Sequence, residues 1–311
     1  MKTNLICAAL VLVAGSVFAA PKDDVSAAIA KLAAADNYSW KTAPVVDPNA
    51  PPAAGGRGRG FGGFGGGAAT VDGKTQKDGL MYVYIPAGGG RGGRRGGGFG
   101  GGGPGGGGPG GGGAGGGGPG GGGPGAGGPA PQMTTNEVVV MGEKGAIKTA
   151  TNWQSFAEAS APPPDDGNGG FPFNPNMMAV NNARNIKAPA VEAKELLDLV
   201  TTVTLANGVY SGDLTEAGAK ARLTPAPFGG RGGGGGGGGF GGGAGPDITG
   251  AKGTVKFWIK DGILSRYEYN LKGSMDFGGN AMDIDRTTGV DIKDVGTTKI
   301  VVPDDAKKKM S

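Results

Sequence analysis

The sequence contains no histidine, and its only cysteine is Cys7. Histidine is the usual general base of nucleophilic enzymes and the commonest metal ligand, so its absence excludes Ser-His-Asp and Cys-His catalysis. Cys7 lies in an N-terminal apolar segment that we expect to be removed, which leaves no thiol for a disulfide or a metal. We therefore expect no enzymatic activity, no cofactor and no metal.

Residues 1–19 have the three parts of a secretory signal peptide. Lys2 provides the positive charge, residues 5–13 the apolar segment, and residues 17–19 a small-x-small cleavage motif. The apolar segment is too short to span a bilayer, so we expect cleavage and no transmembrane segment in the mature chain. The sequence thus predicts an exported protein, and it leaves open whether the destination is the periplasm or the cell exterior.

Glycine makes up 73 of the 311 residues, against a usual share of about 7%. Three tracts, at 53–69, 87–131 and 225–246, hold 54 of these glycines. Such segments bury nothing that would offset the entropy lost on ordering, so we expect long disordered loops. The rest of residues 20–311 is long enough for a single domain that the tracts interrupt.

The charged residues of the glycine tracts are all arginine. They are Arg57, Arg59, Arg91, Arg94, Arg95 and Arg231. Together with nearby phenylalanines they resemble RGG segments, in which arginine binds phosphate and aromatic rings stack on bases. Export argues against a nucleic-acid partner. The tracts are then either plain linkers or loops that bind an anionic polymer of the cell envelope.

Alternation of apolar and polar residues predicts β-strands over much of the remaining chain. The expected strands are 37–46, 70–76, 80–85, 134–141 and 146–149, followed by an Asn-Gly hairpin of 201–206 and 209–214. The expected helices are 25–32, 153–159, 177–185, 189–200 and 215–221. The helix at 189–200 begins with proline and has an apolar stripe of Val191, Leu196, Leu199 and Val200.

The most regular pattern lies in residues 253–303, where four apolar runs alternate with polar residues. These runs contain Val255, Phe257 and Ile259, then Ile263, Tyr267, Tyr269 and Leu271, then Met282 and Ile284, and finally Val290 and Ile292. Four such runs predict an antiparallel meander with one buried and one solvated face. Together with the helices, this indicates an α+β fold.

The densest acidic residues lie in the same stretch. Asp283, Asp285 and Asp291 share one strand face, where oxygen ligands would suit a cation such as Ca²⁺. No Asp-x-Asp-x-Asp-Gly loop encloses an ion, so we interpret them as the solvated face of the sheet. Glu268 and Asp285 form no recognisable catalytic carboxylate pair.

Residues 255–266, Val-Lys-Phe-Trp-Ile-Lys-Asp-Gly-Ile-Leu-Ser-Arg, resemble a strand, Asp-Gly turn and return strand of the periplasmic lipoprotein-carrier (LolA-like/LppX-like) superfamily. The strand at 290–296 and residues 300–306 resemble its ending. The chain also resembles exported bacterial proteins with glycine-rich insertions, a likeness that implies no function. The superfamily resemblance implies a curved antiparallel half-barrel, covered by helices, that holds acyl chains in its concavity.

The apolar side of the meander is therefore the candidate ligand site. Its residues are Val255, Phe257, Ile259, Tyr267, Tyr269, Leu271, Met282 and Ile284. The same residues would serve as a plain sheet core. The leading hypothesis is a non-enzymatic exported protein that binds a lipid or lipoprotein on the concave face. The alternatives are an envelope interaction protein that acts through its arginine-bearing loops, and a nucleic-acid binder.

Overall fold

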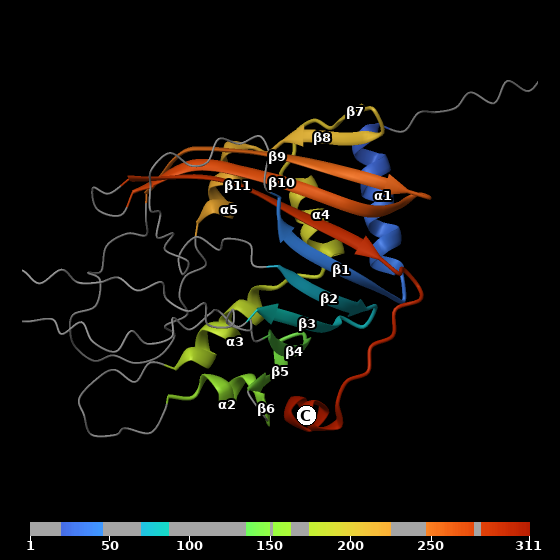
Figure 1. The fold of residues 1–311 in the computed structure, drawn as a ribbon. Coiled ribbons are helices and arrows are strands. Elements are labelled where there is room, and N and C mark those ends of the chain that lie inside the picture. The colour runs from blue at the N-terminus through green and yellow to red at the C-terminus, as the bar shows by residue number, and fades with distance from the viewer. Residues whose placement is uncertain are drawn as a thin grey trace, which may run out of the picture.

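The computed structural model describes residues 20–45, 70–86, 135–149, 152–162, 174–224, 247–276 and 281–311. Eleven antiparallel strands form one sheet in the order β6-β5-β4-β3-β2-β1-β11-β10-β9-β8-β7. The sheet curves around a layer of helices and does not close (Figure 1). The predicted α+β half-barrel is confirmed. The predicted signal peptide and the three glycine tracts lie outside the described residues.

The first half of the chain builds one wing of the sheet. Its elements are α1 (Pro21–Ala34), β1 (Asn37–Pro44), β2 (Val71–Gln76), β3 (Leu80–Pro86), β4 (Thr135–Met141), β5 (Lys144–Thr149) and β6 (Asn152–Ser155). The strands from β1 to β6 follow one another in sequence and in space. The short turns of β2–β3 and β4–β5 contain Gly79 and Gly142, whose positive φ angles suit glycine.

Helices and a short hairpin follow. These elements are α2 (Phe156–Ser160), α3 (Pro175–Asn185), α4 (Pro189–Asp198), β7 (Thr204–Ala206), β8 (Val209–Asp213) and α5 (Glu216–Leu223). The β7–β8 turn is the predicted Asn-Gly turn, with φ of 52° at Asn207 and 77° at Gly208. Two successive positive φ values give the twist that a two-residue hairpin needs.

The second wing consists of the long strands β9 (Asp247–Lys260), β10 (Ile263–Asp276) and β11 (Ala281–Lys293), and α6 (Asp304–Met310) ends the chain. The last two apolar runs of the predicted meander belong to one strand, since β11 pairs with β10 without a break from Ala281 to Asp291. The polar residues Arg286 and Thr288 occupy inward positions and interrupt the apolar alternation. The prediction of four runs was therefore wrong by one strand.

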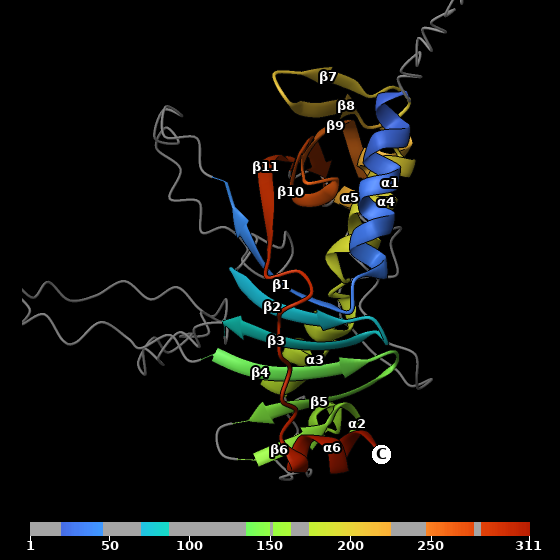
Figure 2. The same ribbon diagram turned by 90° about the vertical axis from the view of Figure 1, so that its right-hand side faces the viewer.

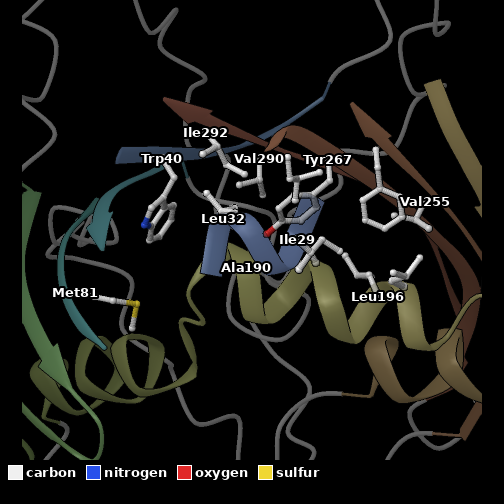
Figure 3. Packing of buried hydrophobic residues seen from close by; sticks show 14 of the residues in the cluster. Ile29, Leu32, Trp40, Met81, Ala190, Leu196, Val255, Tyr267, Val290 and Ile292 are labelled. Atoms are coloured by element: carbon white, nitrogen blue, oxygen red, sulfur yellow. The ribbon is translucent and has the colours of Figure 1, made fainter. Parts of the chain in front are cut away.

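The main core fills the space between the concave face of the sheet and the helices α1, α4 and α5 (Figures 2 and 3). Helix α1 buries the predicted stripe of Val25, Ile29 and Leu32, together with Ala28. Leu32, Trp40, Val290 and Ile292 approach one another in Figure 3. Their packing joins the two wings of the sheet to the helix layer.

Two predicted helices differ from the structure. Residues 152–155 form β6 instead of a helical turn, and the helix begins at Phe156, after a capping box between Ser155 and Glu158. In α4 the predicted stripe residue Val191 is 51% exposed. The other stripe residues are placed as predicted, since Leu196 and Val200 are buried and Leu199 packs against the core, but the buried side also includes Ala190, Ala193 and Leu197. Helix α4 packs closely against α1, and the small alanine side chains on its buried side permit such an approach, a signal that a search for large apolar residues misses.

The opposite, convex face of the sheet is solvated only in part. Over β3, β4 and β5 a second cluster contains Tyr82, Val139 and Ala146, covered by Val302 and Ala306 from the C-terminal segment. The sequence did not predict α6, which forms part of this cover. Among the described helices, none has the length and apolar character needed to cross a membrane.

The strand ends that border the glycine tracts lie at one end of the sheet. They are Pro44, Val71, Pro86, Thr135, Asp247 and, beside them, Asp276 and Ala281. Pro86 pairs directly with Thr135, and Asp276 pairs with Asp247 on one side and Ala281 on the other. These ends gather at the left of Figure 1, so the three tracts are attached to the same end of the half-barrel.

Candidate functional site

The eight residues predicted for the ligand site share the concave face. Tyr267 pairs with Phe257 in β9 and with Val290 in β11, and Tyr269 pairs with Val255. Directly paired residues point to the same side of a sheet. Val255, Phe257, Tyr267 and Leu271 are fully buried, with at most 1% of their surface exposed. These four are core residues beneath the helix layer.

The other four residues are less completely buried. Ile259, Tyr269 and Ile284 are partly buried and pack against the core. Met282, at the start of β11, is 36% exposed. Met282 therefore marks an exposed edge of the concave face at the end of the sheet where the glycine tracts are attached, next to the buried Met275 of β10.

The other candidates from the sequence lie elsewhere. Asp285 forms an ion pair with Lys272 at 2.9 Å, and Asp291 with Arg266 at 2.8 Å, on the convex face. Asp283 is exposed. Within the described residues no group of acids is arranged to hold a metal ion. The arginines of the glycine tracts lie outside the described residues.

A polar cluster lies within the apolar concave layer. The Glu192 carboxylate of α4 accepts a hydrogen bond at Oε2 from the Tyr267 hydroxyl, at 2.7 Å. Its Oε1 accepts hydrogen bonds from the Tyr269 hydroxyl at 3.2 Å and from Arg222 Nη1 of α5 at 3.3 Å. Three donors from the sheet and α5 thus converge on one carboxylate.

The surrounding charges form a short network. Arg222 Nη2 also donates to Glu195 at 2.9 Å, and Lys187 donates to the same carboxylate at 2.6 Å. Arg286 of β11 donates to the backbone carbonyl oxygen of Arg222 at 3.4 Å. The side chains of Glu192 and Arg222 are only about one-fifth exposed. Low exposure strengthens these charge-assisted bonds relative to surface pairs.

Burial determines the protonation of the two tyrosines. It raises the pKa of Tyr267 well above its ordinary value, and the negative charge of Glu192 raises that pKa further. The pKa of Tyr269 is raised to about 12 by burial and by Glu192. Both hydroxyls are therefore neutral donors at physiological pH. This arrangement can bind an anion or the polar end of an amphipathic molecule.

The strand pattern of the sequence predicts Tyr267 and Tyr269 as site residues but does not indicate Glu192 or Arg222. Their positions on two short helices follow no motif, and they meet only because α4 and α5 cover the same part of the sheet. Placing Val191 inward in α4 also concealed the inward position of its neighbour Glu192. The one available signal was the alanine pair at 190 and 193, which marks the buried side of the helix.

Two clefts lie outside the concave layer. One, of about 570 Å³, adjoins the ends of β8 and β9 and is lined by Asp213, Glu216, Lys252 and Lys272 among others. The second, of about 520 Å³, lies between β6 and α6. Neither includes any of the eight predicted ligand residues. The assignment of these eight to a ligand site stays a prediction.

We expect the protein to lose stability at strongly alkaline pH. The folded protein holds the protons of Tyr267 and Tyr269 more tightly than the unfolded chain, whose tyrosines titrate near pH 10. The resulting stabilisation is fully present below pH 10 and is lost as the pH rises through about 12. The pKa values of Tyr38, Tyr82 and Tyr210 are raised by burial as well. Tyrosinate absorbance at 295 nm, followed together with circular dichroism, should therefore show several tyrosines, Tyr267 and Tyr269 among them, that ionise only as the protein unfolds. Complete tyrosine titration below pH 11 in folded protein would contradict this.

Comparisons with known proteins show similarity in architecture only. No protein-family model matches the chain, and no curated protein is similar to it in sequence. Among solved structures, LprF from Mycobacterium bovis is similar with a TM-score of 0.37 and 8% identity, over 92% of this chain and 97% of that one. The lipoprotein LppX from Mycobacterium tuberculosis is similar with a TM-score of 0.36 and 6% identity, over 91% and 98%. At these TM-scores and identities nothing about a family or a ligand follows from the similarity.

Proposed function

We propose that the protein is a non-enzymatic, exported binding protein that accommodates an apolar ligand, a lipid acyl chain, between the concave face and its helix cover. The observation that carries this proposal is the convergence of Tyr267, Tyr269, Arg222 and Glu192 within an otherwise apolar layer. Ligand sites are typically apolar surfaces with a few convergent polar groups. A layer with only a structural role would gain stability from apolar packing at these positions.

The packing of α4 supports the idea that this helix can move away from the concave face. Two of its five buried residues are Ala190 and Ala193, which bury less apolar surface than leucine would. Residues 186–188 and 201–203, outside any helix, flank α4 and its last turn. An acyl chain inserted from the exposed edge at Met282 would cover the surface that α4 exposes on moving.

A chain-length series tests this function. Isothermal titration of residues 20–311 with saturated fatty acids of increasing length should give rising affinity, by roughly fourfold for each buried methylene group. The gain should cease once the concave face is covered. The absence of binding at every length would refute the proposed function.

A matched pair of variants locates the site. Met282→Gln places a polar amide on the exposed edge of the concave face and should weaken binding. Asp283→Asn changes the next residue of β11, which points to the convex face, and should leave the affinity unchanged. Equal effects of the two substitutions would place the ligand elsewhere.

A second function is favoured by one specific observation, the attachment of all three glycine tracts at one end of the sheet. Six arginines without acidic residues among them would then be presented together, which suits an anionic envelope polymer. Binding of the full mature chain to lipopolysaccharide should fall steeply with salt, because such contacts are electrostatic. Replacement of the six arginines by serine should abolish it. Unchanged binding in that variant would exclude this function.

Shortening the longest tract should stabilise the fold. Pro86 and Thr135 are paired, so a four-residue turn containing glycine can replace residues 87–134 without altering the strands. The smaller loop-closure entropy predicts a gain of about 2 kcal/mol in the free energy of unfolding, measured in urea. Unchanged ligand content together with lost envelope association would separate the two functions. A destabilised variant would show that residues 87–134 contribute contacts to the fold.

A further inference from the structure

The Glu192 carboxylate is held in the concave layer as a bound anion would be. Both of its oxygens accept hydrogen bonds, one from Tyr267 and the other from Tyr269 and Arg222. The two tyrosines belong to β10, and the arginine belongs to α5. The donors thus belong to the sheet and to α5, which together we call the wall of the site, whereas the acceptor belongs to α4.

Departure of α4 would remove the Glu192 acceptor from all three donors, of which Tyr269 keeps a hydrogen bond with Thr288. While α4 covers them, Tyr267 has no exposed surface and Arg222 is 19% exposed, so without Glu192 both donors would need another acceptor. Buried donors without partners are costly, and a charged donor is costlier than a neutral one. A molecule that brings its own negative oxygens to this position would remove that cost.

The charge distribution favours an anion in the same way. Glu192 and Glu195 both lie on α4, and Lys187, which binds Glu195, immediately precedes that helix. Arg222 and Arg286 lie on the wall. Arg286 is the only charged residue at the inward positions of β9, β10 and β11, and it donates to the carbonyl oxygen of Arg222. Without α4, Arg222 would lose both of its carboxylate partners, Glu192 and Glu195.

We propose that Tyr267, Tyr269 and Arg222 form the head-group site of the ligand, and that Glu192 occupies this site as an internal substitute when no ligand is bound. This inference rests on the proposed function and specifies its ligand class, an acyl chain with an anionic head group. A carboxylate or a phosphate supplies the required chemistry. Guanidinium recognises either one through paired N–H donors, and the two hydroxyls complete the set.

The test compares three ligands that share one alkyl chain. These are a fatty acid, the alcohol of the same length and the corresponding alkyl phosphate, each titrated into residues 20–311. The acid or the phosphate should bind at least about tenfold more tightly than the alcohol, since a hydrogen bond to a charged group contributes more than a neutral one. The tighter of the two anions identifies the head group as carboxylate or phosphate.

Variants separate a head-group role from a structural one. Arg222→Gln should lower the affinity for both anions about tenfold or more while the alcohol changes by less than twofold. Glu192→Gln weakens the internal substitute and should raise the affinity for all three ligands about fivefold. Lys220→Gln removes a charge from an exposed position of α5, the helix that carries Arg222, and should leave the affinity for all three ligands unchanged. Tyr269→Phe removes one donor with little change in shape. Thermal unfolding of every variant verifies that it is folded.

The outcomes distinguish this inference from the function on which it rests. Equal binding of acid, phosphate and alcohol, unaffected by Arg222→Gln, would overturn the head-group site and leave the apolar binding function intact. A loss of all three ligands in folded Arg222→Gln protein would indicate a structural role for Arg222 and also overturn it. Failure of every ligand to bind the unmodified chain would overturn both.

Discussion

Replacement of Phe257 by alanine is expected to lower the free energy of unfolding by about 3–5 kcal/mol. Its ring is fully buried and is paired with Tyr267 on one side and Tyr210 on the other. Truncation removes the buried ring and leaves a cavity that neighbouring strands cannot close, because each is fixed by its own hydrogen bonds. Since single domains have only about 5–15 kcal/mol of stability, the loss should be plain in urea unfolding.

The adjacent Lys256 provides the control. It lies on the same strand with its side chain exposed on the convex face, so Lys256→Ala should change stability by less than about 0.5 kcal/mol. A loss below 1 kcal/mol for Phe257→Ala would contradict the assignment of the concave centre to the core. Such a result would indicate an open cavity at this position.

Substitution of Gly73 by alanine should cost about 3 kcal/mol. Gly73 of β2 is directly paired with Trp40 of β1, and a Cβ added there would overlap the indole ring. Trp40 is itself buried and donates from Nε1 to the Thr75 hydroxyl at 3.0 Å. The ring can move only by losing that hydrogen bond and its packing against the helix layer.

A double-mutant cycle with Trp40→Leu tests the cause. If the overlap explains the loss, Gly73→Ala should cost much less when the indole is absent, with a coupling energy of at least about 1 kcal/mol. Additive losses would show that glycine is required for a backbone reason instead. Chemical denaturation of the four proteins provides the measurement.

The sequence predicted most strands because alternation depends only on which face is buried. The alternation that includes Val255, Phe257 and Tyr267 can be recognised without any knowledge of the rest of the fold. Prediction from alternation failed at positions whose residue type depends on a tertiary contact. Arg286 and Thr288 face inward next to the polar cluster and divided β11 into two apparent runs. The inward alanines of α4 lie on a helix that packs closely against α1, and no local pattern reveals a close approach between distant elements.

The candidate site was half predictable for the same reason. Tyr267 and Tyr269 belong to the alternating strand and were named from it. Glu192 and Arg222 lie 30 residues apart on separate helices, and the strands that bring them together lie still further along the chain. Their meeting depends on how α4 and α5 pack on β10, which is a property of the complete sheet.

Native mass spectrometry of the protein isolated from its own cell envelope tests the central claim most directly. The account predicts a stoichiometric bound lipid, released on unfolding and carrying an acyl chain with an anionic head group. Extraction and fragmentation would identify that molecule. A spectrum that contains only the unliganded mature chain, from protein that is folded and never exposed to detergent, would contradict the claim that the concave face is a binding site.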